Sequence, residues 1–195
     1  LEQSLALQGL VGCAIRKTYF DSMKGIVRSD FIRPENLIVN YYTRYIEDAP
    51  RVTHVRQMTD SDIKQMQADG IFLKGVEFDS INNTPDVGDN KQAEDERTGQ
   101  TQPENDKNVS VRTILEQHCW DNFEDTDKPS LPYIKIVDKE TKQVLRIESR
   151  LNPHKTGNTY QKTINYFTKY DLFPSPTGSF YPMGFGALLD NINET

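Results

Sequence analysis

The sequence has few of the residues from which active sites, metal centres and disulfide frameworks are built. Its 195 residues include three histidines and two cysteines, Cys13 and Cys119. The two cysteines lie far apart and lack metal-ligand spacing, which predicts two reduced thiols rather than a zinc site or a disulfide framework. The chain also lacks a P-loop, a Gly-x-Ser-x-Gly motif and a His-Glu-x-x-His motif. These absences leave little from which to predict an enzyme, a bound metal or a cofactor.

Long apolar runs and an excess of basic charge are missing as well. No run approaches the ~20 apolar residues that a membrane-spanning helix needs. Lysine and arginine number 23 against 29 acidic residues, so the formal net charge is -6. A domain that grips nucleic acid is usually basic. The composition therefore argues against such a domain, although it allows a surface that DNA passes without being held.

Most of the negative charge lies in one polar segment, residues 82–108. Seven acidic and three basic side chains give it a net charge of -4, and its only apolar side chains are Val87 and Ala93. Such a segment buries too little surface to offset the entropy of ordering it. We therefore expect a solvated, mobile loop. Asp86 and Asp89 suggest a calcium site as the alternative, but their spacing is not that of an EF-hand.

Alternating apolar residues predict short strands joined as hairpins. We expect strands at 10–20, 26–32, 37–39, 52–58, 71–78, 109–120, 131–137, 143–150 and 162–171. One hairpin pairs residues 131–137 with 143–150, with Ile134 and Ile136 on one buried face and Leu145 and Ile147 on the other strand's buried face. The pattern is that of an α+β fold, with antiparallel hairpins and a small mixed sheet.

One or two short helices complete the predicted fold. Thr59 and Asp62 form a capping box for a helix that ends before Gly70. A second helix is expected over residues 1–9, with Leu5 on its apolar face and Gly9 as its stop. We divide the chain into an N-terminal part (1–81), the acidic loop (82–108) and a C-terminal part (109–195).

The last stretch, Phe167–Thr195, has the least ordinary composition. Prolines and glycines at positions 174, 176, 178, 184 and 186 interrupt a dense aromatic block. We expect a strand, a Pro-Gly turn, an aromatic loop and then the first turns of a helix at Leu188. The chain starts without Met and stops inside that helix, so we expect it to be a piece of a longer protein.

A second cluster, Glu116-Gln117-His118-Cys119-Trp120-Asp121, invites a zinc or cysteine-nucleophile interpretation. That interpretation would make the chain a small hydrolase or a metal-dependent nuclease. On a strand, however, successive side chains point to opposite faces, so His118 and Cys119 do not converge. We expect instead a strand at a sheet edge with an anchoring tryptophan, and we interpret His54 as an ordinary strand histidine.

Aromatic residues in predicted loops are the better candidates for function. Exposed aromatic surface usually marks contact with another protein. The candidate interface residues are Tyr41, Tyr42, Tyr45, Phe180, Tyr181 and Phe185. The alternative is a non-catalytic binding module that uses the tyrosines as a platform for carbohydrate or peptide.

The C-terminal stretch also carries a family resemblance. A strand ending at Tyr170–Pro176, the run Gly178–Gly186 and a helix opening at Leu188–Glu194 together resemble the portal proteins of tailed bacteriophages, most of all the large P22-like portals. Further phrases similar to that family occur in the family's order at 34–37, 49–54, 116–120 and 132–147. The resemblance runs from about Val11 to Thr195 and is interrupted by the acidic loop.

The resemblance implies a structural role without chemistry. Portal subunits form a ring, usually of twelve copies, at one capsid vertex, through which double-stranded DNA is packaged and later ejected. The chain would be an internal fragment of such a subunit, part of its outer wing. Its partners would be other subunits, the terminase, capsid or scaffold protein and tail adaptors. DNA would pass without sequence-specific binding, no membrane would be involved, and the protein would be found in the virion and, during assembly, in the host cytoplasm.

Overall fold

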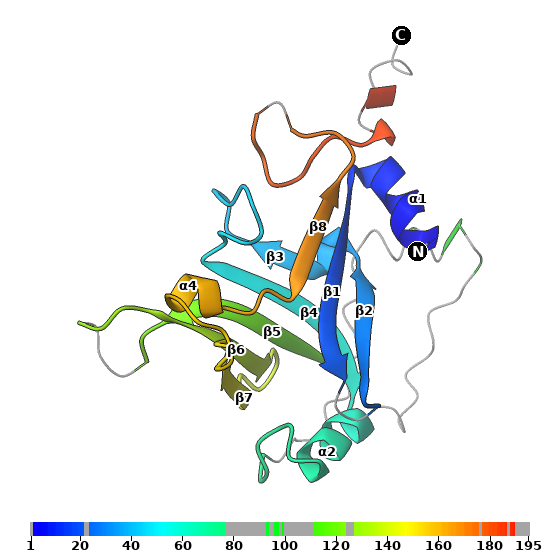
Figure 1. Cartoon of the computed structure of the whole chain (residues 1–195). Helices are drawn as coiled ribbons and strands as arrows, with labels where there is room; N and C mark the ends of the chain where they lie inside the picture. Colours follow the sequence, from blue (N-terminus) through cyan, green and yellow to red (C-terminus); the bar gives the residue numbers. More distant parts are fainter. Residues whose placement is uncertain are drawn as a thin grey trace. The chain divides into compact units, whose positions relative to one another are not determined.

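The computed structural model describes residues 2–21, 24–76, 111–123, 127–175, 177–186 and 188–189, together with residues 93, 96, 97 and 99 (Figure 1). The chain divides into two compact units. Unit 1 comprises Leu1–His54, Gln117–Ile134 and Glu148–Thr195, and unit 2 comprises Val55–Glu116 and Lys135–Ile147. Two antiparallel sheets and short helices confirm the predicted α+β class. Most of the predicted acidic loop, 82–108, lies outside the described residues.

A three-stranded antiparallel sheet has the order β2-β1-β8 and belongs to unit 1. Its strands are β1 (Cys13–Asp21), β2 (Ile26–Ile32) and β8 (Phe167–Asp171). The predicted hairpin of the first two strands is confirmed, with Thr18 opposite Ser29. On its other side β1 pairs with β8, with Lys17 opposite Phe167. This pairing brings the C-terminal stretch against the start of the chain.

The second sheet has five strands in chain order, β3-β4-β5-β6-β7. They are β3 (Leu37–Val39), β4 (Arg51–Thr59), β5 (Val111–Asp121), β6 (Leu131–Asp138) and β7 (Val144–Ser149). The strand β5 is therefore central, and the expectation that it forms a sheet edge was wrong. Along β6, buried and half-buried residues alternate, as predicted for Ile134 and Ile136. On β7 Leu145 is buried but Ile147 is exposed, so only half of that predicted face is covered.

Helix α1 (Glu2–Val11) runs past the predicted stop at Gly9. It ends at Gly12, whose φ of 98° lies in the left-handed region that favours glycine. Leu5, expected on the buried face, is exposed. The amphipathic pattern of so short a segment is weak, and neighbours distant in sequence decide which residues are covered.

Helix α2 (Asp60–Ala68) begins as predicted with a capping box. The Thr59 hydroxyl accepts from the Asp62 backbone N–H at 3.1 Å, and the Asp62 carboxylate accepts from the Thr59 backbone N–H at 3.2 Å. After Gly70 the predicted strand 71–78 does not form over the described residues 71–76, which are bends and turns. The Gln67 side-chain amide instead donates to the carbonyls of Leu73 and Val76. The segment thus folds back onto the end of the helix.

Shorter helical segments also occur in the described part of the chain. A 3-10 turn, η1 (Pro34–Asn36), occupies the predicted turn before β3. The turn α4 (Thr159–Lys162) was not predicted, and its last residue falls where the strand 162–171 was expected to begin; Asn158 and Gln161 form its capping box. Helical conformation resumes at residues 185, 186, 188 and 189, near the predicted helix start. No helix in the described part of the chain is both long enough and apolar enough to span a membrane.

Unit 1 has a hydrophobic core to which the sheets and loops both contribute. Its buried members include Ile15, Leu37, Val52, Phe167 and Phe180. They come from strands β1, β3, β4 and β8 and from the C-terminal loop. The core therefore ties the loop at 177–181 to the segment around residue 40, and this connection positions the candidate site.

Candidate functional site: a tyrosine-lined groove

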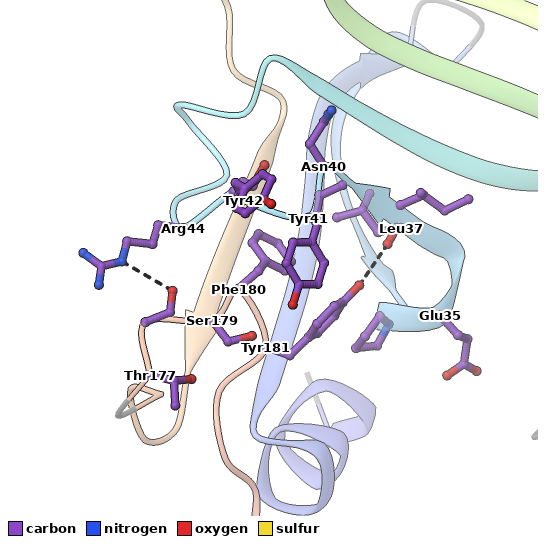
Figure 2. Close-up of a pocket in the computed structure, with 15 residues that line it drawn as sticks. Glu35, Leu37, Asn40, Tyr41, Tyr42, Arg44, Thr177, Ser179, Phe180 and Tyr181 are labelled. Carbon is purple, nitrogen blue, oxygen red and sulfur yellow. Dashed lines mark hydrogen bonds between the residues drawn. The ribbon is translucent and has the colours of Figure 1, made fainter.

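A groove of about 730 Å³ lies in unit 1 between the segment Pro34–Arg44 and the C-terminal loop Thr177–Tyr181 (Figure 2). We call it the tyrosine groove, because Tyr41, Tyr42 and Tyr181 line it. Strand β3 contributes its three residues to the same lining. Two segments more than 130 residues apart in sequence thus form one surface.

Tyr41 and Tyr42 form the tip of one wall. The backbone N–H of Thr43 donates to the carbonyl of Asn40 at 3.0 Å, which closes a turn with the two tyrosines at its apex. At this apex Tyr41 is 91% exposed and Tyr42 is 94% exposed. Their rings meet edge to face with centroids 5.1 Å apart, a geometry that aromatic pairs favour. The fold itself therefore gains little burial from either ring.

The opposite wall is held by two side-chain hydrogen bonds (Figure 2). The Tyr181 hydroxyl donates to the Leu37 carbonyl at 3.3 Å, and Arg44 Nε donates to the Gly178 carbonyl at 3.4 Å. Burial, with a smaller contribution from Cys13, raises the pKa of Tyr181 above its ordinary value. Tyr181 is therefore a neutral phenol at physiological pH, fitted to donate a hydrogen bond rather than to act as a base or nucleophile.

Phe180 anchors this wall to the core. It was predicted as an exposed interface residue, but it is only 4% exposed, and that expectation was wrong. The ammonium group of Lys169 lies 4.5 Å from the centre of its ring, within the range of a cation–π contact. Lys169 also pairs with Asp171 at 2.8 Å. Phe180 is therefore a structural residue that fixes Tyr181 beside it.

The remaining predicted aromatics lie outside the groove. Tyr45 is exposed and lines a second hollow together with Tyr42, Arg44 and Asp48. Phe185 packs edge to face against Phe173, with ring centroids 5.8 Å apart. The structure thus brings Tyr41, Tyr42, Phe180 and Tyr181 together and leaves Phe185 apart.

The polar residues of the groove were not predicted. Arg44 is exposed, and no carboxylate of the described chain pairs with it. Asn40 Oδ1 and Thr43 Oγ1 are buried without a hydrogen-bond partner among the described residues. Buried polar atoms usually find partners, and these two are covered by the protein itself rather than exposed in the groove. The position of Arg44 within the run of tyrosines was the only signal in the sequence for these residues.

The side chains of the Glu116–Asp121 cluster have separate surroundings in the described part of the chain. His118 is buried, and its ring centroid lies 4.7 Å from that of Phe167 and 5.3 Å from that of Tyr166. Cys119 is buried and takes part in no disulfide among the described residues. In unit 2, Glu116 pairs with Arg56 at 3.4 Å. No group of three or more His, Cys, Asp or Glu side chains that would hold a metal ion occurs among the described residues.

The other two histidines of the chain lie in equally ordinary surroundings. His54 is half-buried, and its ring meets that of Phe167 edge to face at 6.3 Å. His154 is exposed in the loop before α4. The tyrosine groove, in contrast, offers exposed aromatic rings and polar side chains for binding.

Comparison of the chain with models of known protein families finds no match, and comparison with curated proteins finds none either.

Proposed function

We propose that this chain is a structural part of a bacteriophage portal subunit, and that the tyrosine groove is one of its contacts with a neighbouring protein of the ring or capsid. The observation that carries the proposal is the exposure of Tyr41 and Tyr42 at the rim of the groove. The sequence resemblance described above supplies the class of assembly.

The groove fits protein contact better than catalysis. Tyrosine is enriched in protein interfaces because it offers a large rigid apolar face together with one polar atom. The well-packed centre of an interface usually holds the aromatic residues that dominate its affinity. Tyr181, with its raised pKa and its hydroxyl donating to a backbone carbonyl, is held as a hydrogen-bond donor rather than as a nucleophile.

The negative charge of the chain supports the same proposal. A protein that holds DNA neutralises phosphates with Lys and Arg, and each such contact must be broken when the DNA moves. With a net charge of -6, this chain is unsuited to such contacts. A ring through which double-stranded DNA moves during packaging and ejection benefits from weak contacts to the phosphates.

A non-catalytic binding module remains the second candidate, and one observation favours it. The rings of Tyr41 and Tyr42 are almost fully exposed and line the groove. They would serve equally well as a platform for a saccharide or a peptide. The two candidates differ in assembly, because a module is expected to work as a monomer, whereas a portal subunit works only within a ring.

Electron microscopy of the complete gene product that contains this chain tests the proposal. We expect closed rings with a central hole. Discrete small particles at every protein and salt concentration would contradict the portal assignment and favour the binding module.

A variant pair then tests the groove itself. The double change Tyr41→Ser and Tyr42→Ser should reduce the yield of rings, or the incorporation of rings into capsids, without lowering the melting temperature. Tyr160→Ser is the matched control, because Tyr160 is an exposed tyrosine of unit 1 outside the groove, stacked on Trp120. Equal assembly by the double variant and the control would show that the groove is not an assembly contact.

A further inference from the structure

A small cavity lies inside unit 1, separate from the tyrosine groove. Its volume is about 20 Å³, enough for one water-sized molecule or a single monatomic ion. The lining comes from the loop after the tyrosines, from β4 and β5, from the residue after β7, and from the start of β8 and the two residues before it: Ile46, Glu47, Ala49, Val52, His118, Arg150, Asn165, Tyr166 and Phe167.

Arg150 is the unusual residue of this lining. It is only 7% exposed, and its Nε atom is buried without a hydrogen-bond partner. Its Nη1 atom donates to the Ile164 carbonyl at 3.4 Å. The Arg150 backbone is fixed as well, since its N–H donates to Pro132 and its carbonyl accepts from Ile164. The guanidinium group is thus held inside the unit.

The charge of Arg150 has no counter-ion in the described chain. None of the described carboxylates forms an ion pair with it. Burial lowers the pKa of Arg150 from its ordinary value, but arginine starts so far above neutral pH that the group stays cationic. A buried charge without a partner is costly, and proteins normally pair such charges.

We propose that the cavity is a binding site for a small monatomic anion, chloride under physiological conditions, with the Arg150 guanidinium group as its positive partner. A chloride ion matches both the size of the cavity and the sign of the charge. Water matches the size only, because it leaves the charge unbalanced. Glu47 is the other source of negative charge in the lining, but it is exposed and does not pair with Arg150.

A bound ion would stabilise the segment that carries the exposed tyrosines. Ile46, Glu47 and Ala49 directly follow the tyrosine segment, whereas His118 belongs to β5 and Arg150 follows β7. An ion bound between them would tie the loop to the sheet. Chloride should therefore stabilise the unit whether or not the protein forms a ring, so this inference stands independently of the portal assignment.

Crystals of the 195-residue chain grown in sodium bromide test the site directly, because bromide replaces chloride and gives an anomalous signal. We expect an anomalous peak in the cavity, in contact with the Arg150 guanidinium group. A water molecule, or the Glu47 carboxylate, in that position without an anomalous peak would overturn the proposal.

Thermal melting in solution provides the second test. At constant ionic strength, replacing gluconate by chloride should raise the melting temperature by a few degrees and then saturate, as expected for a ligand that binds the folded state. Arg150→Met should abolish this rise, whereas Arg51→Met, at an exposed arginine of the same unit, and Glu47→Gln should keep it. A chloride response that survives Arg150→Met, or one that Glu47→Gln abolishes, would contradict the assignment.

Discussion

The contact between Gly12 and Gly184 gives a sharp prediction about stability. A Cβ atom built on Gly184 would lie 2.6 Å from the Gly12 nitrogen and 2.6 Å from the Val11 carbonyl carbon, and it would also overlap the Leu10 carbonyl oxygen. A Cβ on Gly12 would lie 2.6 Å from the Met183 carbonyl carbon. All of these neighbours are backbone atoms, which cannot rotate away. The end of α1 and the C-terminal loop therefore pack backbone to backbone.

The expected cost of Gly184→Ala follows from this geometry. Forcing one extra carbon into a well-packed site typically costs about 1–3 kcal/mol. In a protein of this size each kcal/mol lowers the melting temperature by about 2–4 °C. Gly184→Ala should therefore lower the melting temperature by roughly 2–12 °C. The φ angle of Gly184 is not in the left-handed region, so the lack of space is the cause.

Gly9→Ala is the matched control from the same junction. A Cβ atom on Gly9 would meet only Phe185 Cδ2, at an ordinary distance of 3.9 Å. Because Gly9 lies inside α1, alanine should stabilise that helix by about 0.5–1 kcal/mol. The same substitution should thus raise stability at one site and lower it at the other. A Gly184→Ala variant that melts at or above the wild-type temperature, measured by circular dichroism, would refute the close contact.

Three other predictions concern buried side chains. Arg112→Met should lower the free energy of unfolding, measured in urea, by about 3–5 kcal/mol. The reason is that the fully buried carboxylate of Asp138, 3.3 Å from Arg112 Nη1, loses its cation. Unchanged stability would contradict this. Burial alone would raise the pKa of Asp138, but hydrogen bonds from Glu140 and Thr141, with Arg112, hold it below the ordinary value. The ionised Asp138 carboxylate therefore stabilises the fold above the pKa of the unfolded state, and this stabilisation is lost as the pH falls through the lower folded pKa. Asp138→Asn should make the free energy of unfolding depend less on pH in the acid range. An unchanged dependence on pH would count against this. His118→Ala and Cys119→Ala should lower only stability, by roughly 1–3 kcal/mol; stoichiometric zinc in the purified protein, lost in both variants, would overturn that expectation.

Features that depend on neighbouring residues could be predicted from the sequence. The capping box of Thr59 and Asp62 forms because both partners lie within one turn. The hairpin of β1 and β2 forms because its strands are separated only by a short loop. The alternation along β5 was enough to argue that His118 and Cys119 point to opposite faces. The capping box and the hairpin were specified locally, and the structure has both where the pattern indicated.

Features that depend on distant partners could not be predicted. The end of α1 is set at Gly12 by the backbone of Met183 and Gly184, more than 170 residues away in sequence. Phe180 looked like its exposed neighbours in sequence, but the core residues that cover it come from other strands. Ile147 shares a strand face with Leu145, yet it lies on the outermost strand of its sheet and stays exposed. Burial is decided by what covers a residue, and sequence alternation does not carry that information.

The two exposed tyrosines of the groove offer a large area for contact with another molecule. A tyrosine side chain has about 150–250 Å² of surface, so two almost fully exposed tyrosines present roughly 300–500 Å². A standard protein interface takes about 800 Å² from each partner. Tyr41 and Tyr42 alone would supply about half of that area, while contributing little to the fold, because each is more than 90% exposed. Two such residues at the apex of one turn serve the fold no better than serines, and the physical advantage of tyrosine there lies in contact with another molecule.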